Sequence, residues 1–132
     1  MAAVLIVGAD EALGLETSRL LTSAGHTVVA EGADLDVLII DAGAPREFES
    51  ALVEVVRVLQ SHLPALERSA APVVVITGHD ALARAVATLV AVRYADSFPR
   101  LRINGAGPDA AVIARTAQIG PSGPSGAYFE AV

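Results

Sequence analysis

The sequence predicts an α/β fold in which helices cover both faces of one open, parallel β-sheet, giving three layers. Short unbroken apolar runs recur along the chain, and such runs are typical of strands that are buried on both faces. They alternate with longer segments of helical pattern, as parallel βαβ units require. Apolar residues make up 53% of the 132 residues, which excludes a disordered chain and allows one packed core. We therefore predict a single domain over residues 1–132.

The individual elements follow from this alternation. Residues 104–126 are rich in glycine and proline and are predicted to be mainly loop, with a turn of helix at 109–118 as an option. The sequence at 127–129 is compatible with a short sixth strand. The predicted strands are residues 4–7, 28–30, 37–40, 73–76 and 101–103, and the predicted helices are about 12–24, 46–68 and 80–96.

The link between the second and third predicted strands is unusually short. Only residues 31–36 are available, whereas a parallel crossover usually needs about a dozen residues and a helix. At ~3.3 Å per residue this link reaches roughly 20 Å. The crossover must therefore be nearly extended and without a helix, or the second strand is absent or paired differently. In either case we expect one face at this sheet edge to lack its helical cover.

Two of the predicted helices are apolar on nearly every side. Between residues 81 and 92 only Arg84 and Thr88 are polar, and the helix at 46–68 is similar in its middle turns. A helix that covers a sheet needs one apolar stripe, so apolar residues all round indicate burial on a second side. In so small a domain the simplest second side is another copy, which predicts a dimer through helices 46–68 and 80–96. The alternative is an alanine-rich helix that exposes little apolar area.

The composition excludes several kinds of chemistry. All nine basic residues are Arg, and the absence of Lys and Cys excludes Schiff-base and thiol catalysis, disulfides and thiolate metal sites. His26, His62 and His79 lack the spacing of metal ligands. The net charge of −6 argues against a nucleic-acid partner, and no apolar run is long enough for a membrane span. The N-terminus lacks the pattern of a signal peptide, so we expect a cytoplasmic protein.

Two segments near the N-terminus resemble a known family. Residues 8–14, Gly-Ala-Asp-Glu-Ala-Leu-Gly, follow the first predicted strand and open the first helix. They resemble the nucleotide-binding loop Gly-x-x-x-Gly-x-Gly of the short-chain dehydrogenase/reductase (SDR) family, with Ala12 at the middle glycine. The segment at 35–43 resembles the strand of that family that ends in Asn-Asn-Ala-Gly, with Ile40 and Asp41 in place of the asparagines.

Three further segments resemble the same family in the same order. Residues 59–66 and 73–78 are similar to its interface helix and to the strand that carries its catalytic serine. Residues 102–104 with Pro108 resemble its Arg-Val-Asn…Pro-Gly segment, and residues 123–129 resemble its Gly-Pro-Thr-Gly-Gly-Phe-Phe ending. The five segments together cover most of the chain. The resemblance implies a shortened Rossmann fold of the NAD(P)-binding type.

The resemblance also implies a vestigial cofactor-binding site at Gly8, Asp10, Glu11, Gly14 and Asp41. Such loops bind pyrophosphate because free N–H groups and the helix dipole favour anions. Asp10 and Glu11 place two negative charges in the loop. We therefore expect no bound cofactor, keep NAD as an option and consider NADP excluded. The alternative role of these two acids is structural, because acids in a first helical turn cap its N–H groups.

Catalysis in the SDR family depends on a serine and a Tyr-x-x-x-Lys motif, in which the lysine lowers the pKa of the tyrosine. This chain has no Lys, and the position of the serine falls at Thr77 or Gly78. Its tyrosines, Tyr94 and Tyr128, are not in such a motif. We therefore predict no catalytic residue and an inactive, dimeric binding or assembly module, with a full-length SDR relative as the alternative partner. A residual NAD-dependent oxidoreductase is the enzyme alternative.

The chain lacks the segment that carries the third strand of the SDR fold. Removing that strand from the order 3-2-1-4-5-6 leaves the flavodoxin-like order 2-1-3-4-5, to which the tail adds a short sixth strand. This order also resembles response-regulator receivers. A pseudo-receiver signalling domain is thus a second alternative, with Asp41 as vestigial phosphoacceptor, Asp10 as a Mg²⁺ ligand and Thr77 as the switch hydroxyl. Asp41 and Thr77 are expected to ring one crevice with His79 and Asp80, unless Asp80 caps the third helix and His79 is a loop residue.

Overall fold

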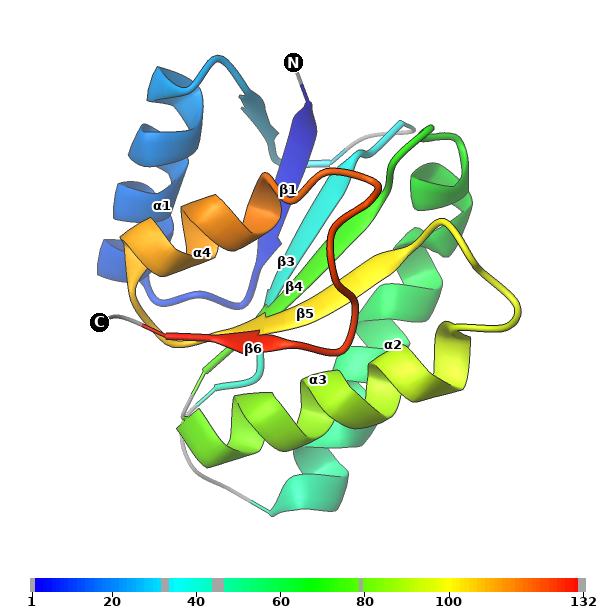
Figure 1. Cartoon of the computed structure of the whole chain (residues 1–132). Helices are drawn as coiled ribbons and strands as arrows, with labels where there is room; N and C mark the ends of the chain where they lie inside the picture. Colours follow the sequence, from blue (N-terminus) through cyan, green and yellow to red (C-terminus); the bar gives the residue numbers. More distant parts are fainter. Residues whose placement is uncertain (1, 32–33, 44–46, 79, 131–132) are drawn as a thin grey trace.

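The computed structural model describes residues 2–31, 34–43, 47–78 and 80–130. Its strands form one sheet in the order β2-β1-β3-β4-β5-β6, and every neighbouring pair is parallel (Figure 1). The predicted α/β fold, the strand order 2-1-3-4-5 and the short sixth strand are therefore confirmed. The strands are β1 (Ala3–Val7), β2 (Thr27–Val29), β3 (Val37–Asp41), β4 (Val73–Thr77), β5 (Arg102–Ala106) and β6 (Tyr128–Phe129). The helices are α1 (Glu11–Ser23), α2 (Phe48–Glu67), α3 (Asp80–Tyr94) and α4 (Ala110–Ala117).

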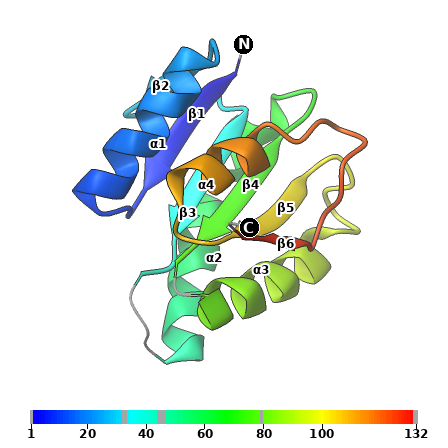
Figure 2. The same ribbon diagram turned by 60° about the vertical axis from the view of Figure 1, so that its left-hand side comes forward.

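The helices cover the two faces of the sheet in pairs. Figure 2 shows α1 and α4 on one side of the sheet and α2 and α3 on the other. In β3, Leu38 and Ile40 belong to the core on the α2 and α3 side, whereas Val37 and Ile39 belong to the core on the α1 and α4 side. The strands are apolar at successive positions because both faces are covered. Within the described residues, no helix is long and apolar enough to cross a membrane.

The link from β2 to β3 carries no helix in its described residues 30–31 and 34–36. β2 is three residues long and pairs with the first three residues of β1, so the return path to the start of β3 is short. Leu35 is only 2% exposed and enters the core on the α2 side, where a crossover helix would otherwise lie. Val7 and Val29 on the same face are partly exposed. The described part of the link therefore carries no helix, as the sequence predicts, and the partly exposed valines agree with the expected lack of helical cover; the prediction of an extended crossover also involves residues 32–33, which lie outside the described residues.

The prediction that residues 104–126 are mainly loop is wrong for the first half of that segment. β5 continues to Ala106, and α4 has eight residues rather than a single turn. Asp109 starts α4, because its carboxylate accepts an N–H of the first turn at 3.1 Å. Glycine here serves close packing. A Cβ on Gly105 would lie 2.8 Å from Cδ1 of Tyr128, so β6 lies against β5 only because position 105 has no side chain.

The C-terminal segment is held to the sheet by a buried amide. Asn104 of β5 has no exposed surface, and its Nδ2 donates to the carbonyl of Pro124 at 2.9 Å. Its Oδ1 accepts the N–H of Ala127 at 2.9 Å. β6 then continues the pairing, since the N–H of Gly107 donates to the carbonyl of Phe129 at 2.8 Å. This segment is therefore part of the sheet.

Two buried threonines on the α1 and α4 side of the sheet provide a stability test. The hydroxyl of Thr17 in α1 is buried and has no hydrogen-bond partner among the described residues. The hydroxyl of Thr116 in α4 donates to the carbonyl of Val112 at 2.7 Å. Because an unpaired buried hydroxyl costs about 1–3 kcal/mol, we expect Thr17→Val to raise the free energy of unfolding and Thr116→Val to lower it by about 1 kcal/mol. Urea denaturation of both variants measures the difference, and a stabilised Thr116→Val with a destabilised Thr17→Val would contradict this assignment.

Candidate functional site

The first candidate site is the edge of the sheet where the parallel strands end. The direction in which strands are added to the sheet reverses at β1, because β2 lies on one side of β1 and β3 and the later strands lie on the other. Ligands of open α/β sheets bind outside the carboxyl ends of the strands at such a switch point. Gly8, which follows β1, has a φ of +83°, and a Cβ there would lie 3.3 Å from the carbonyl oxygen of Asp41. The structure thus brings the predicted residues Gly8 and Asp41 together.

The N-terminus of α1 is already occupied by an acid of the chain itself. Asp10 is the N-cap, and its Oδ1 accepts the N–H of Leu13 at 2.9 Å. Glu11 follows in the first turn, and Gly14 lies in the helix with its N–H bonded to the carbonyl of Asp10 at 2.9 Å. The structural role predicted as the alternative for Asp10 is therefore what the structure shows. Helix capping uses one of the donors that an external anion would need.

Asp41 ends β3 beside this loop and is about half-buried. Burial raises the pKa of this carboxyl above its usual 3.8, and the negative charge of Asp10 raises it further. The N–H of Gly43 opposes this shift, because it donates a 2.7 Å hydrogen bond to Oδ1. A Cβ on Gly78, after β4, would lie 3.4 Å from the same Oδ1. Asp41 thus lies among three loops of the carboxyl edge.

A pH experiment tests this environment. The pKa of Asp41 is higher in the folded state than in the unfolded state, so ionisation of this carboxyl destabilises the fold. The stability of the protein therefore falls as the pH rises from the unfolded-state pKa through the folded-state pKa. Asp41→Asn keeps the acceptor for Gly43 and cannot ionise. We expect this variant to melt at a higher temperature than the wild type at pH 7, with the difference closing below about pH 4. A melting difference that is the same at both pH values would contradict the assignment.

These residues do not match the needs of a dinucleotide. The described part of this edge holds the carboxylates of Asp10, Glu11 and Asp41; Arg46 and His79 lie outside the described residues. A pyrophosphate is an anion, so it requires unpaired N–H groups or cations. The carboxylates supply the wrong charge.

The hydroxyl groups of Thr77, Tyr94 and Tyr128 have different surroundings. Thr77 is fully buried, and its Oγ1 donates to the carbonyl of Gly107 at 3.1 Å. Tyr94 is the last residue of α3, and its side chain is part of the core. Tyr128 lies in β6, and the guanidinium of Arg84 lies 4.4 Å from the centre of its ring. Asp41 and Thr77 are register partners in β3 and β4, as expected for neighbours in one crevice. The predicted contribution of His79 to that crevice falls outside the described residues, and the pseudo-receiver interpretation stays a prediction.

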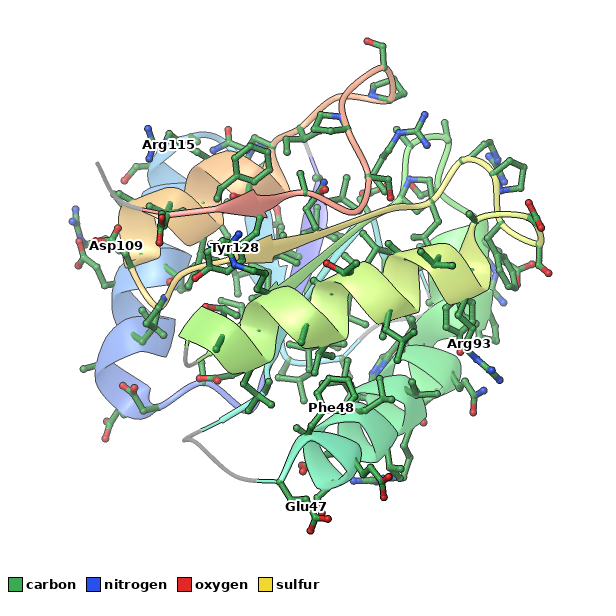
Figure 3. The ribbon with its side chains drawn as sticks, turned by 60° about the horizontal axis from the view of Figure 1, so that its bottom comes forward. Glu47, Phe48, Arg93, Asp109, Arg115 and Tyr128 are labelled. Atoms are coloured by element: carbon green, nitrogen blue, oxygen red, sulfur yellow. The ribbon has the colours of Figure 1, made fainter. Side chains whose placement is uncertain are left out.

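The second candidate site is the outer face of α2 and α3. Large apolar side chains with substantial exposure occur at five described positions, and four of them lie here. Val53 and Val92 are 66% and 71% exposed. Figure 3 shows Phe48 at the end where α2 begins and Arg93 toward the other end. We call this surface the α2/α3 face; its members are Phe48, Leu52, Val53, Val56, Ala85, Leu89 and Val92.

The α2/α3 face is hollowed on both sides of Leu89. One hollow of about 440 Å³ lies between the middle of α2 and the end of α3, and Arg57 and Arg93 form part of its wall. The other, of about 590 Å³, lies between Phe48 and the side of α3 that runs from Ala81 to Val92, and Arg84 forms part of its wall. The remaining exposed large apolar residue, Leu15, lies on α1. The sequence predicts which helices carry this surface, but it gives no signal for the position of Phe48.

Comparison with known proteins is consistent with this architecture. No family model and no curated protein matches the chain. Among solved structures, the chain is similar to salutaridine reductase from Papaver somniferum, with a TM-score of 0.74 and 12% sequence identity over 98% of this chain and 99% of that chain. The fold is Rossmann-like. At this identity the similarity establishes the fold alone.

Proposed function

We propose that this protein is a catalytically inactive relative of the SDR family that acts as a dimeric binding or assembly module. The order of five SDR-like sequence segments supports the relationship, as does the fold shared with a reductase at a TM-score of 0.74. The observation that carries the assembly role is the α2/α3 face, which gathers four of the five highly exposed large apolar side chains of the described residues. Exposed apolar patches of this kind mark interaction surfaces.

The absence of an ammonium group supports inactivity. Hydride transfer to a carbonyl requires a proton donor, and the SDR resemblance assigns this task to a tyrosine beside a lysine. The chain has no Lys, and the hydroxyl of Tyr94 is buried without a hydrogen-bond partner among the described residues. Thr77 stands near the position of the family serine, but its hydroxyl is bonded to a backbone carbonyl. Within the described residues, these hydroxyl groups therefore lack the arrangement needed for proton transfer.

The charges at the carboxyl edge support a protein that works without a dinucleotide. Asp10 caps α1, and Asp41 lies half-buried beside it. Both carboxylates would repel the pyrophosphate of NAD, and NADP adds a further phosphate to that repulsion. We therefore propose that neither cofactor is bound.

The occupant we propose for the α2/α3 face is a second copy of the chain. In an isologous pair the same surface of both copies is buried in one interface. A single interface therefore covers the exposed apolar residues of both copies. The chain mass of 13.5 kDa gives a clear expectation in solution. Light scattering at micromolar concentration should give twice this mass, and a full-length relative as partner would instead leave the isolated chain monomeric.

A second measurement separates this proposal from the oxidoreductase alternative. A ligand that binds only the folded state raises the melting temperature. We expect no increase with millimolar NADH or NADPH and no oxidation of either with carbonyl substrates. A dimer whose melting temperature is unchanged by NADH supports the proposal. A monomer would overturn the assembly role, and a clear increase of the melting temperature with NADH would overturn the proposed absence of a cofactor.

A further inference from the structure

We propose that the hollow between the middle of α2 and the end of α3 binds an amphiphilic carboxylate, a small molecule with an apolar chain and one anionic head. The apolar chain lies on Val56 and Leu89, and the head pairs with Arg57 and Arg93. This site needs only one copy of the protein. Its effect on assembly rests on the proposed dimer, because the ligand and a second copy cover the same surface.

The hollow has the size and the apolar lining of a small-molecule site. Its volume of about 440 Å³ lies within the range of about 300–1,000 Å³ that is typical of ligand pockets. Val90 of α3 is fully buried in the core and forms part of the wall. Leu52 and Val56 of α2 and Leu89 of α3 add further apolar groups. Such a lining favours a ligand with an apolar body.

The polar groups of the hollow select an anion. They are Arg57, Gln60 and Arg93, and no carboxylate of the described residues belongs to the wall. Arg57 and Arg93 are exposed, and neither guanidinium has an ion pair within the part of the chain that the structure describes. Guanidinium groups match carboxylates in both charge and hydrogen-bond geometry. The chain as a whole carries a net charge of −6, so attraction of an anion depends on this local pair.

The direction of the helices separates the apolar end of the hollow from its polar end. Both helices follow strands of a parallel sheet and return on the same side of it, so they run in the same direction (Figure 1). Arg57 and Gln60 therefore lie beyond Leu52 on α2, at the end where Arg93 lies beyond Leu89 on α3. Figure 3 shows Arg93 near the end of α3, beside α2.

This polarity orients the ligand and indicates its length. The head lies at the end with the two guanidinium groups, and the apolar chain extends toward Leu52 and Leu89. From Leu52 to Gln60 the wall spans eight residues of α2, which at ~1.5 Å per residue is about 12 Å. A short, unbranched fatty acid such as octanoate suits a hollow of this length.

The ligand and the second copy compete for the α2/α3 face. Val53 and Leu89 belong to that face and also to the wall of the hollow, and they are 66% and 45% exposed. A ligand that covers them leaves less apolar surface for a partner. Because such coupling is reciprocal, the carboxylate weakens pairing by the same factor as pairing weakens binding of the carboxylate. The free carboxylate thus regulates the proposed assembly.

Calorimetric titration with octanoate at pH 7 tests the site. We expect one octanoate per chain and binding of 1-octanol that is at least about tenfold weaker, because the alcohol lacks the charge that the arginines select. Arg93→Gln and the isosteric Gln60→Glu should each raise the octanoate dissociation constant by about fivefold without changing that of 1-octanol. Arg115→Gln removes an exposed guanidinium from α4 and is the matched control, for which no change is expected.

Two further measurements locate the ligand and test the competition. Octanoate should shift amide resonances of α2 and α3 in NMR spectra, and at saturation it should raise the dimer dissociation constant at least about tenfold in sedimentation velocity. Ala85→Asp places a carboxylate in the proposed interface but outside the wall of this hollow, so this variant should be monomeric and should still bind octanoate.

The outcomes separate the site from the dimer. Failure of octanoate to bind either the wild type or Ala85→Asp, or equal binding of 1-octanol, would overturn the site and leave the proposed dimer standing. A dimer that binds octanoate without dissociating would overturn the competition. A monomeric wild type that binds octanoate would overturn the proposed dimer while the site stands.

Discussion

Replacing Asn104 by alanine is expected to lower the free energy of unfolding by about 2–5 kcal/mol, the largest stability effect that we predict for a single side chain. The amide is fully buried and makes two hydrogen bonds of 2.9 Å, to Pro124 and Ala127. Alanine leaves a backbone carbonyl and a backbone N–H without these partners and adds a cavity. Urea denaturation measures the loss.

Gln118→Ala is the matched control for this prediction. Gln118 also makes two hydrogen bonds through its amide, to Ala114 and His26, but it lies near the surface, where water replaces lost partners. We expect a loss of less than about 1 kcal/mol. Hydrogen exchange should show that Asn104→Ala exposes the N–H of Gly107, which β6 protects in the wild type. Equal losses for the two variants would contradict the role of Asn104 as the anchor of the C-terminal segment.

Replacing Leu89 by aspartate is expected to convert the dimer into a monomer at micromolar concentration. Leu89 is 45% exposed in the single chain and borders both hollows of the α2/α3 face. In the dimer the substitution would bury two carboxylates without partners, which raises the dissociation constant by at least about 100-fold. In the monomer the carboxylate is hydrated, so the chain should stay folded.

Leu15→Asp provides the control for Leu89→Asp. Leu15 is 65% exposed and lies on α1, on the other side of the sheet. The same change of an apolar side chain to a carboxylate should leave the mass at twice 13.5 kDa. A dimer that survives Leu89→Asp, or one that is lost equally in both variants, would contradict the assignment of the interface to the α2/α3 face.

The sequence predicts the sheet well because its signal is local. Each buried strand appears as a short apolar run, and β2, although only three residues long, follows from Val28 and Val29. The short link to β3 even predicts the absence of a crossover helix. α4 is predicted at the right place but only as a turn, because the glycines and prolines on either side of it suggest a loop. Gly105, by contrast, is glycine to admit the ring of Tyr128.

The candidate sites are less predictable because they depend on contacts between distant segments. The capping role of Asp10 is a local signal, since an Asp before a helix is a common N-cap. The shifted pKa of Asp41 depends on burial by three loops, and the role of Asn104 depends on residues 20 and more positions away. Apolar residues all round a helix predict a second contact surface. Only the structure shows that Val58 and Leu59 face the chain's own core while Val53 faces outward.

The pairing of two copies through the α2/α3 face is tested most directly by distances between spin labels. The chain has no Cys, so a single introduced cysteine carries one label per copy. Ser50→Cys places the label on α2 beside the face, and Leu15→Cys places it on α1, across the sheet. Pulsed electron double resonance should give an inter-copy distance for Ser50→Cys that is clearly shorter than for Leu15→Cys. A shorter distance for Leu15→Cys, or no coupling between copies at either position, would contradict the pairing.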